Sequence, residues 1–170
     1  MKRNILSLVV IMCFSILLIG CSTDDTDMEN IVTNFSENYE ESSYGTDEGL
    51  NTLSDLQIIL DSSDSLEQLD FIIENKSDKD YQYSESYFEI EGEESGKWYQ
   101  LAQKKDPSQS NEVESIIKPG KTKHLILNIK KYYGVLPSGH YRLIKDFAYF
   151  EHPKDWNYDT YILSCEFDID

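Results

Sequence analysis

The feature that most restricts the fold is the alternation of residue types at the end of the chain. Tyr161, Leu163, Cys165, Phe167 and Ile169 occupy every second position, and mostly polar residues lie between them. Successive side chains of a β-strand point to opposite faces, so this spacing places all five on one face. The chain is therefore expected to end in a strand that packs one face against a hydrophobic core.

Shorter segments of the same kind recur from residue 55 onward. They are 56–60, 69–74, 83–90, 97–101, 124–129 and 141–147. A loop is expected at 91–96, and Lys118-Pro119-Gly120-Lys121 is a strong turn signal. No amphipathic segment is long enough for a substantial helix. About seven short strands therefore predict an all-β fold, an antiparallel two-sheet β-sandwich over residues 55–170.

The first 20 residues have the composition of a signal peptide. Lys2 and Arg3 precede the apolar run Ile5–Ile19, which is short for a membrane-spanning helix of about 20 residues. The next segment, Leu18-Ile19-Gly20-Cys21, resembles a bacterial lipobox. That resemblance implies cleavage after residue 20 and a diacylglyceryl group on the Cys21 thiol. Two acyl chains anchor a protein stably, so we expect a lipid-anchored protein on the extracytoplasmic face of the cell membrane.

The cysteines predict a domain without disulfides. Cys13 lies in the expected signal peptide, which leaves Cys21 and Cys165 in the mature chain. Because Cys21 is expected to carry lipid, no intramolecular pair remains and packing alone must hold the domain.

Residues 21–54 are expected to form an acidic, largely disordered tether. The segment is rich in Ser, Thr, Asn, Asp and Glu and contains no Lys or Arg, so it offers little apolar surface to bury. An acidic recognition tail is the alternative. The whole chain has 15 basic and 32 acidic residues and a formal net charge of -17, which argues against nucleic acid as a partner.

Two stretches carry a family resemblance. One is Leu69–Lys79 together with Gly96-Lys97-Trp98-Tyr99, and the other is Ile117-Lys118-Pro119-Gly120 followed by YGVLPSGHYRLIK at 133–145. Over residues 55–170 the chain resembles a bacterial immunoglobulin-like domain of small lipoproteins, chiefly from Gram-positive bacteria. The resemblance implies an immunoglobulin-like sandwich at the cell envelope, with no enzymatic role or shared ligand to carry over.

Individual residues of these stretches have expected structural roles. Gly134 and Gly139 are expected to supply positive φ angles between the sheets, and Tyr141 is expected to fix this connection through its hydroxyl, as a tyrosine corner does. Trp98 is expected to pack in the core rather than to bind a ligand. Cys165, where the family usually has alanine, is also interpreted as a packing residue.

The sequence predicts no catalytic set, no cofactor site and no metal site. The three histidines lack metal-ligand spacing: His124, His140 and His152. One acidic series matches positions 1, 3, 5 and 12 of a calcium loop: Asp155, Asn157, Asp159 and Glu166. Because Thr160 replaces the turn glycine and a strand follows, only a looser calcium site on the 152–159 loop is left open.

Two surface features could support binding. Five lysines lie in the otherwise acidic domain between 118 and 131: Lys118, Lys121, Lys123, Lys130 and Lys131. They form either a patch for an anionic polymer or a solvated strand face. Aromatic residues at 132–158 are the candidates for an exposed rim. We expect an extracytoplasmic binding or accessory protein that recognises an envelope protein or polymer; the alternative is an envelope sensor or protease-inhibitor-like protein.

Overall fold

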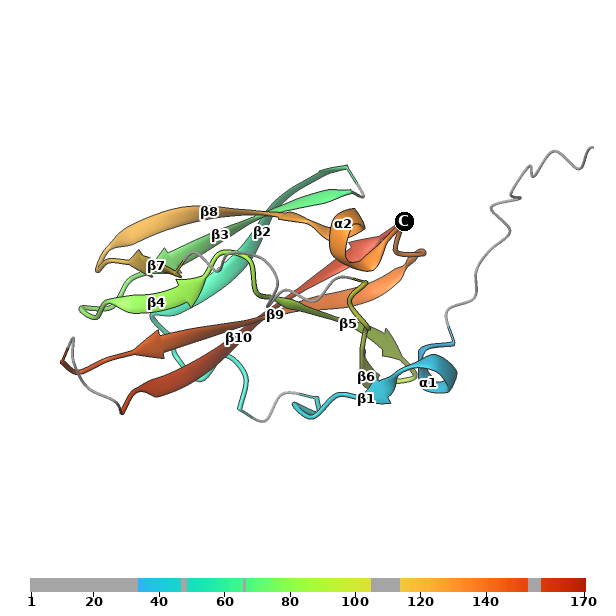
Figure 1. Ribbon diagram of the computed structural model, residues 1–170, viewed down its shortest axis with the longest axis horizontal. Helices are drawn as coiled ribbons and strands as arrows, with labels where there is room; N and C mark the ends of the chain where they lie inside the picture. Colours follow the sequence, from blue (N-terminus) through green and yellow to red (C-terminus); the bar gives the residue numbers. More distant parts are fainter. Residues whose placement is uncertain (1–33, 47–48, 66, 105–113, 153–156) are drawn as a thin grey trace, which may run out of the picture.

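A computed structural model of the chain describes residues 34–46, 49–65, 67–104, 114–152 and 157–170 (Figure 1). These residues form an all-β, immunoglobulin-like antiparallel sandwich, as the sequence predicted. The larger sheet contains, in order, β1 (Glu40–Glu41), β6 (Lys97–Gln100), β5 (Glu89–Glu94), β9 (Gly139–Tyr149), β4 (Tyr81–Ser84) and β7 (Glu114–Ile117), with β10 (Asp159–Ile169) paired to β9. The smaller sheet contains β2 (Leu56–Ser65), β3 (Gln68–Asn75) and β8 (Lys121–Asn128).

The core lies between the two sheets and is built from the alternating residues. In β3 every second side chain is buried, and in β8 Leu125 and Leu127 are buried beside them. From the opposite sheet, Phe167 of β10 meets Phe71 of β3 edge to face, with ring centroids 6.1 Å apart. Each such side chain contributes about 1.5–3 kcal/mol when it is fully buried. The predicted strands at 69–74, 124–129 and 161–169 are therefore confirmed.

Two local predictions about strands were wrong. The segment expected as one strand at 83–90 is divided between β4 and β5, because the Ser84 hydroxyl accepts hydrogen bonds from the backbone N–H groups of Ser86 and Tyr87 and turns the chain. The loop expected at 91–96 is mostly strand. Only Ser95 and Gly96, both with positive φ, separate β5 from β6 in a tight hairpin.

The connection from β8 to β9 carries the predicted tyrosine corner. The Tyr141 hydroxyl donates a 2.6 Å hydrogen bond to the Pro137 carbonyl. Gly134 has a φ of 85° and ends the short helix α2 (Ile129–Tyr133), as expected. Gly139 does not have positive φ, so that prediction was wrong. Its role is steric, since a Cβ there would lie 3.3 Å from the Tyr141 ring.

Part of the segment expected to be a largely disordered tether is folded. Residues 34–46 and 49–54 are folded, with helix α1 (Phe35–Asn38) and strand β1 packed at one end of the sandwich (Figure 1). Phe35 is buried and meets the Tyr141 ring edge to face at 5.8 Å. We call residues 34–46 the N-terminal strap. Residues 22–33 of the expected tether, and the expected signal peptide, lie outside the described residues.

The strap is fixed to the outer face of the larger sheet by a buried ion pair. Arg142 of β9 donates from Nε to Glu91 of β5 at 2.6 Å, and both side chains are 1% exposed. The guanidinium also donates to the carbonyls of Gly45 and Thr46 at 2.8 and 2.9 Å. Strap and sheet are thus joined by charge-assisted hydrogen bonds. Neither helix of the described residues is long and apolar enough to cross a membrane.

Candidate functional site

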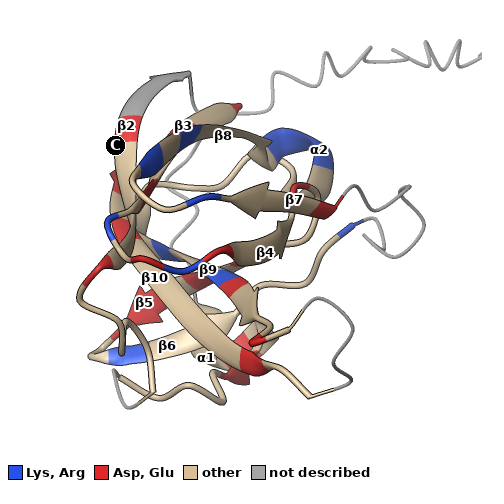
Figure 2. Cartoon of the chain, turned by 90° about the vertical axis from the view of Figure 1, so that its left-hand side faces the viewer, with Lys and Arg blue, Asp and Glu red and all other residues tan. Residues whose placement is uncertain are grey.

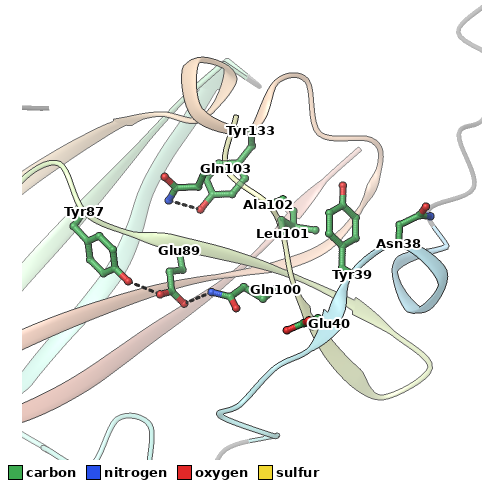
Figure 3. Close-up of a pocket in the computed structure, with 10 residues that line it drawn as sticks. All are labelled: Asn38, Tyr39, Glu40, Tyr87, Glu89, Gln100, Leu101, Ala102, Gln103 and Tyr133. Atoms are coloured by element: carbon green, nitrogen blue, oxygen red, sulfur yellow. Dashed lines mark hydrogen bonds between the residues drawn. The ribbon is translucent and has the colours of Figure 1, made fainter. Parts of the chain in front are cut away.

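The strap and the larger sheet enclose a groove of about 440 Å³ (Figure 3). We call it the tyrosine groove. Its lining comes from the strap, the chain around the start of β5, the chain after β6, and the end of α2: Asn38, Tyr39, Glu40, Tyr87, Glu89, Gln100, Leu101, Ala102, Gln103 and Tyr133. The strap thus forms one side of the groove.

A hydrogen-bonded carboxylate lies at the centre of the groove. Glu89 accepts a 2.5 Å hydrogen bond from the Tyr87 hydroxyl and a 3.0 Å hydrogen bond from Gln100 Nε2 (Figure 3). Burial, together with the hydrogen bond and the negative charge of Glu89, raises the pKa of Tyr87 well above its usual value, so this phenol stays protonated. Glu89 is therefore held in place with acceptor capacity left on its oxygens.

The other end of the groove is closed by an amide and a buried phenol. Gln103 Nε2 donates to the Tyr133 hydroxyl at 2.8 Å and to the Phe88 carbonyl at 2.5 Å. The Tyr133 hydroxyl in turn accepts from the Ile90 backbone N–H at 3.0 Å, and burial raises the pKa of Tyr133 strongly. Gln103 Oε1 is buried without a hydrogen-bond partner among the described residues.

The remaining lining supplies aromatic and short polar surface. Tyr39 is 37% exposed and belongs to the strap, on the side opposite Tyr87 in Figure 3. Amphipathic rings beside fixed carboxylate and amide groups can bind a ligand that has both apolar faces and hydroxyl groups. The described lining contains no histidine, cysteine, serine or lysine. Its polar groups are carboxylates, amides and phenols, which can hold a ligand by hydrogen bonds.

The structure divides the five lysines into two groups. Lys118, Lys121 and Lys123 lie at the start of β8, whereas Lys130 and Lys131 lie in α2 at its other end, as Figure 2 also shows. At about 3.3 Å per residue, the eight residues of β8 separate the groups by about 25 Å. Lys118 pairs with Asp80 and Lys130 with Glu67. A single basic patch is therefore not formed.

The calcium-loop hypothesis is wrong in its helical form. Residues 153–156, which include Asp155, lie outside the described part of the chain. Asp159 is the first residue of β10, and Glu166 lies seven residues further along the same strand, about 23 Å away. Glu166 instead faces His140, with 3.1 Å between Oε2 and Nε2. These two carboxylates cannot share one ion.

Trp98 and Cys165 both pack, but in different places. Trp98 is buried on the outer face of the larger sheet, where the Arg142 guanidinium lies 4.4 Å from the ring centroid and the His140 ring 5.4 Å away. Cys165 is partly buried against the main core, and burial raises the pKa of its thiol. Cys21, the expected lipid-attachment residue, lies outside the described residues.

The tyrosine groove was not anticipated from the sequence. Three of its residues belong to a segment that was expected to be disordered, and the others are spread from Tyr87 to Tyr133 without a motif. The aromatic rim was expected at 132–158, yet only Tyr133 of that stretch reaches this groove. No local pattern in the sequence signals such a site.

Comparison with protein families places the fold. Residues 52–168 match the family model of the bacterial Ig-like domain. The chain belongs to the bacterial Ig-like domain family. Domains of this family are typically non-catalytic. Searches of curated proteins and of solved structures found no match. The strap precedes the matched residues, so the strap side of the groove lies outside the part of the chain that the family model covers.

Proposed function

We propose that this bacterial Ig-like protein is anchored by lipid on Cys21 at the extracytoplasmic face of the cell membrane and binds an envelope polymer without catalysis. The observation that carries the proposal is the tyrosine groove, a polar and aromatic site on a domain of a typically non-catalytic family. The lipobox-like Leu18-Ile19-Gly20-Cys21 supports the location.

The groove favours a neutral, hydroxyl-rich polymer such as a glycan. Its two carboxylates, Glu40 and Glu89, would repel phosphate-rich chains, and no cationic side chain belongs to its lining to offset them. Sugar hydroxyls can donate to Glu89, while the C–H faces of a sugar ring can pack on Tyr39.

The anchor would keep this groove close to the membrane. Thirteen peptide steps join Cys21 to Asn34, the first residue of the strap, so their fully extended length is at most about 45 Å. A site on the strap can then reach polymer only in the layer next to the bilayer. This restricts the partner to envelope material close to the membrane surface.

The anchor is tested by intact mass spectrometry of the protein purified from native membranes, beside a Cys21→Ser variant. We expect a mature chain that begins at Cys21 and carries a diacylglyceryl adduct, with the adduct absent from the variant. A mass equal to residues 1–170, or cleavage elsewhere without lipid, would contradict the anchor and leave the groove untouched.

The binding site is tested with an array of purified neutral and anionic envelope glycans. We expect at least tenfold weaker binding of a neutral glycan by Tyr39→Ala and by Glu89→Gln. Tyr158→Ala is the matched control, since Tyr158 is 56% exposed and is not part of the groove. If both groove variants bind every glycan on the array as well as the native protein does, the proposal is contradicted. Binding only to an envelope protein, or inhibition of an extracellular protease, would support the sensor or inhibitor alternative instead.

A further inference from the structure

A second cluster lies on the outer face of the smaller sheet and is independent of the tyrosine groove. Asp61, Asp70 and His124 come from the three adjacent strands β2, β3 and β8. One carboxylate oxygen from each aspartate and one imidazole nitrogen lie within 4.8 Å of one another. Residues from three consecutive strands thus converge on one point of a flat surface.

A β-bulge sets the position of Asp61 beside the other two residues. The pairing of β2 with β3 shifts register between Leu60 and Ser62, so Asp61 is the extra residue of the bulge and Ser62 is the residue paired with Asp70. In a regular ladder Asp61 would lie directly opposite Asp70. The bulge moves Asp61 out of that pair, and its carboxylate still lies within 4.8 Å of the Asp70 and His124 atoms.

In the pairing of β3 with β8, neither Asp70 nor His124 lies opposite a lysine or an arginine. Asp70 lies opposite Ile126 on β8, and His124 lies opposite Ile72 on β3. The cationic candidate within the cluster is His124 itself, whose Nδ1 lies 3.2 Å from both oxygens of Asp70. With a neutral imidazole, this arrangement holds two anionic groups and one nitrogen lone pair together.

We infer that Asp61, Asp70 and His124 form a surface site for a divalent transition ion, with Zn²⁺ as the representative. Zinc takes imidazole nitrogen and carboxylate oxygen at about 2.0–2.2 Å in tetrahedral geometry, which sets neighbouring ligand atoms about 3.3–3.6 Å apart. The 3.2 Å separation of His124 Nδ1 from the Asp70 oxygens is close to this range. Asp61 is exposed and its carboxylate lies within 4.8 Å of both atoms, and water would complete four ligands.

The choice of ion follows from the ligand set. Calcium and magnesium prefer six or more oxygen ligands, and this cluster offers an imidazole and only two side-chain carboxylates. Zinc, copper and nickel accept the mixed nitrogen and oxygen set. The acidic chain, with a formal net charge of -17, adds a general attraction for cations but no selectivity. The His124 nitrogen supplies the selectivity.

The test is a titration of the full-length protein with Zn²⁺ and separately with Mg²⁺, followed by ¹⁵N NMR and by calorimetry. We expect zinc to shift the signals of residues 61, 70 and 124, and magnesium to leave them in place. His124→Gln and Asp61→Asn are each expected to weaken this zinc binding at least tenfold. His152→Gln and Asp78→Asn are the matched controls, because both residues are exposed and outside the cluster.

The outcomes separate this site from other zinc ligands in the chain. Zinc bound by Cys13, Cys21 or Cys165 would survive in His124→Gln and would leave the signals near residue 124 unchanged. That result, or saturating zinc without any shift at residues 61, 70 and 124, would overturn the proposal. Asp61→Asn keeps the size of the side chain at an exposed position. If the urea midpoint of this variant is unchanged, its loss of zinc binding is not caused by unfolding.

Discussion

At the scale of single residues, the most consequential contact is the buried pair of Arg142 and Glu91. The two residues are direct cross-strand partners in β9 and β5, and the Arg142 guanidinium also stacks on Trp98. Removal of one partner leaves an uncompensated charge in a site that excludes water. Breaking a buried pair in this way costs about 3–5 kcal/mol, whereas an exposed pair contributes about 0–1 kcal/mol.

Glu91→Gln is therefore expected to lower the free energy of unfolding by about 3 kcal/mol, measured by urea denaturation. Glu41→Gln is the control, because Glu41 pairs with Lys97 where both side chains are more than half exposed. We expect that control to change stability by less than about 1 kcal/mol. Equal effects of the two substitutions would show that the buried pair does not hold the strap.

The Tyr141 hydroxyl gives a smaller and equally local prediction. Tyr141→Phe removes the donor of the 2.6 Å hydrogen bond to Pro137 and keeps the buried ring. The expected loss is about 1 kcal/mol in the free energy of unfolding, the usual net value of one hydrogen bond. Tyr158→Phe, at an exposed position, serves as control. An unchanged urea midpoint for Tyr141→Phe would count against the tyrosine corner.

His140 predicts a weak dependence of stability on pH. Its Nδ1 lies 2.7 Å from Asp168 and its Nε2 3.1 Å from Glu166. The hydrogen bond with Asp168, opposed by partial burial and reinforced by Glu166, raises the pKa of His140 above its usual value. Arg142 and Trp98 also lie close to this region of the sheet.

A raised pKa in the folded state means that protonated His140 stabilises the fold. This contribution is complete below the unfolded-state pKa of about 6.5 and is lost as the pH rises through the folded-state pKa. Because the side chain is 36% exposed, screening keeps the effect below about 1 kcal/mol. The difference in urea midpoint between the native protein and His140→Gln should decrease as the pH is raised from about 6 to about 8. A constant difference across this range would contradict the ion pairs.

At the scale of elements, the strap depends on one glycine. A Cβ on Gly92 would lie 2.4 Å from the ring of Phe35, so alanine there and a docked Phe35 exclude each other. Gly92→Ala should lower stability by about 1–3 kcal/mol and increase amide exchange in residues 35–41. The double variant with Phe35→Ala should be no less stable than Phe35→Ala alone, because the clash is then absent. If the losses of stability in the two single variants add up in the double variant, Gly92→Ala does not act through a clash with Phe35.

The elements also show how far sequence patterns reach. Alternation located β3, β8 and β10, because burial on one face leaves a direct trace in the residue types. The strap left no such trace: a few anchors, such as Phe35, lie among acidic residues, and the fixing contacts are carbonyls of Gly45 and Thr46 held by Arg142. The β-bulge at Asp61 was equally hidden, since it depends on the partner strand.

At the scale of the whole molecule, the segment that leads toward Cys21 also forms one side of the tyrosine groove. Asn38, Tyr39 and Glu40 belong to the strap, and Phe35 holds the strap to the core without lining the groove. Binding in the groove and docking of the strap must therefore favour each other. A ligand that binds only the docked state stabilises it in proportion to its affinity for that state.

Phe35→Ala provides the test of this coupling, because Phe35 does not line the groove and its ring lies against that of Tyr39, with ring centroids 6.1 Å apart. If the strap is released in a fraction of molecules, the apparent affinity for a groove ligand falls by that fraction. We expect at least tenfold weaker glycan binding by Phe35→Ala, measured by calorimetry at a temperature where the sandwich remains folded. Ile116→Ala, at an exposed residue of β7, is the control and should bind normally. Normal affinity in Phe35→Ala would mean that the groove forms without a docked strap, and the segment next to the anchor would then have no part in recognition.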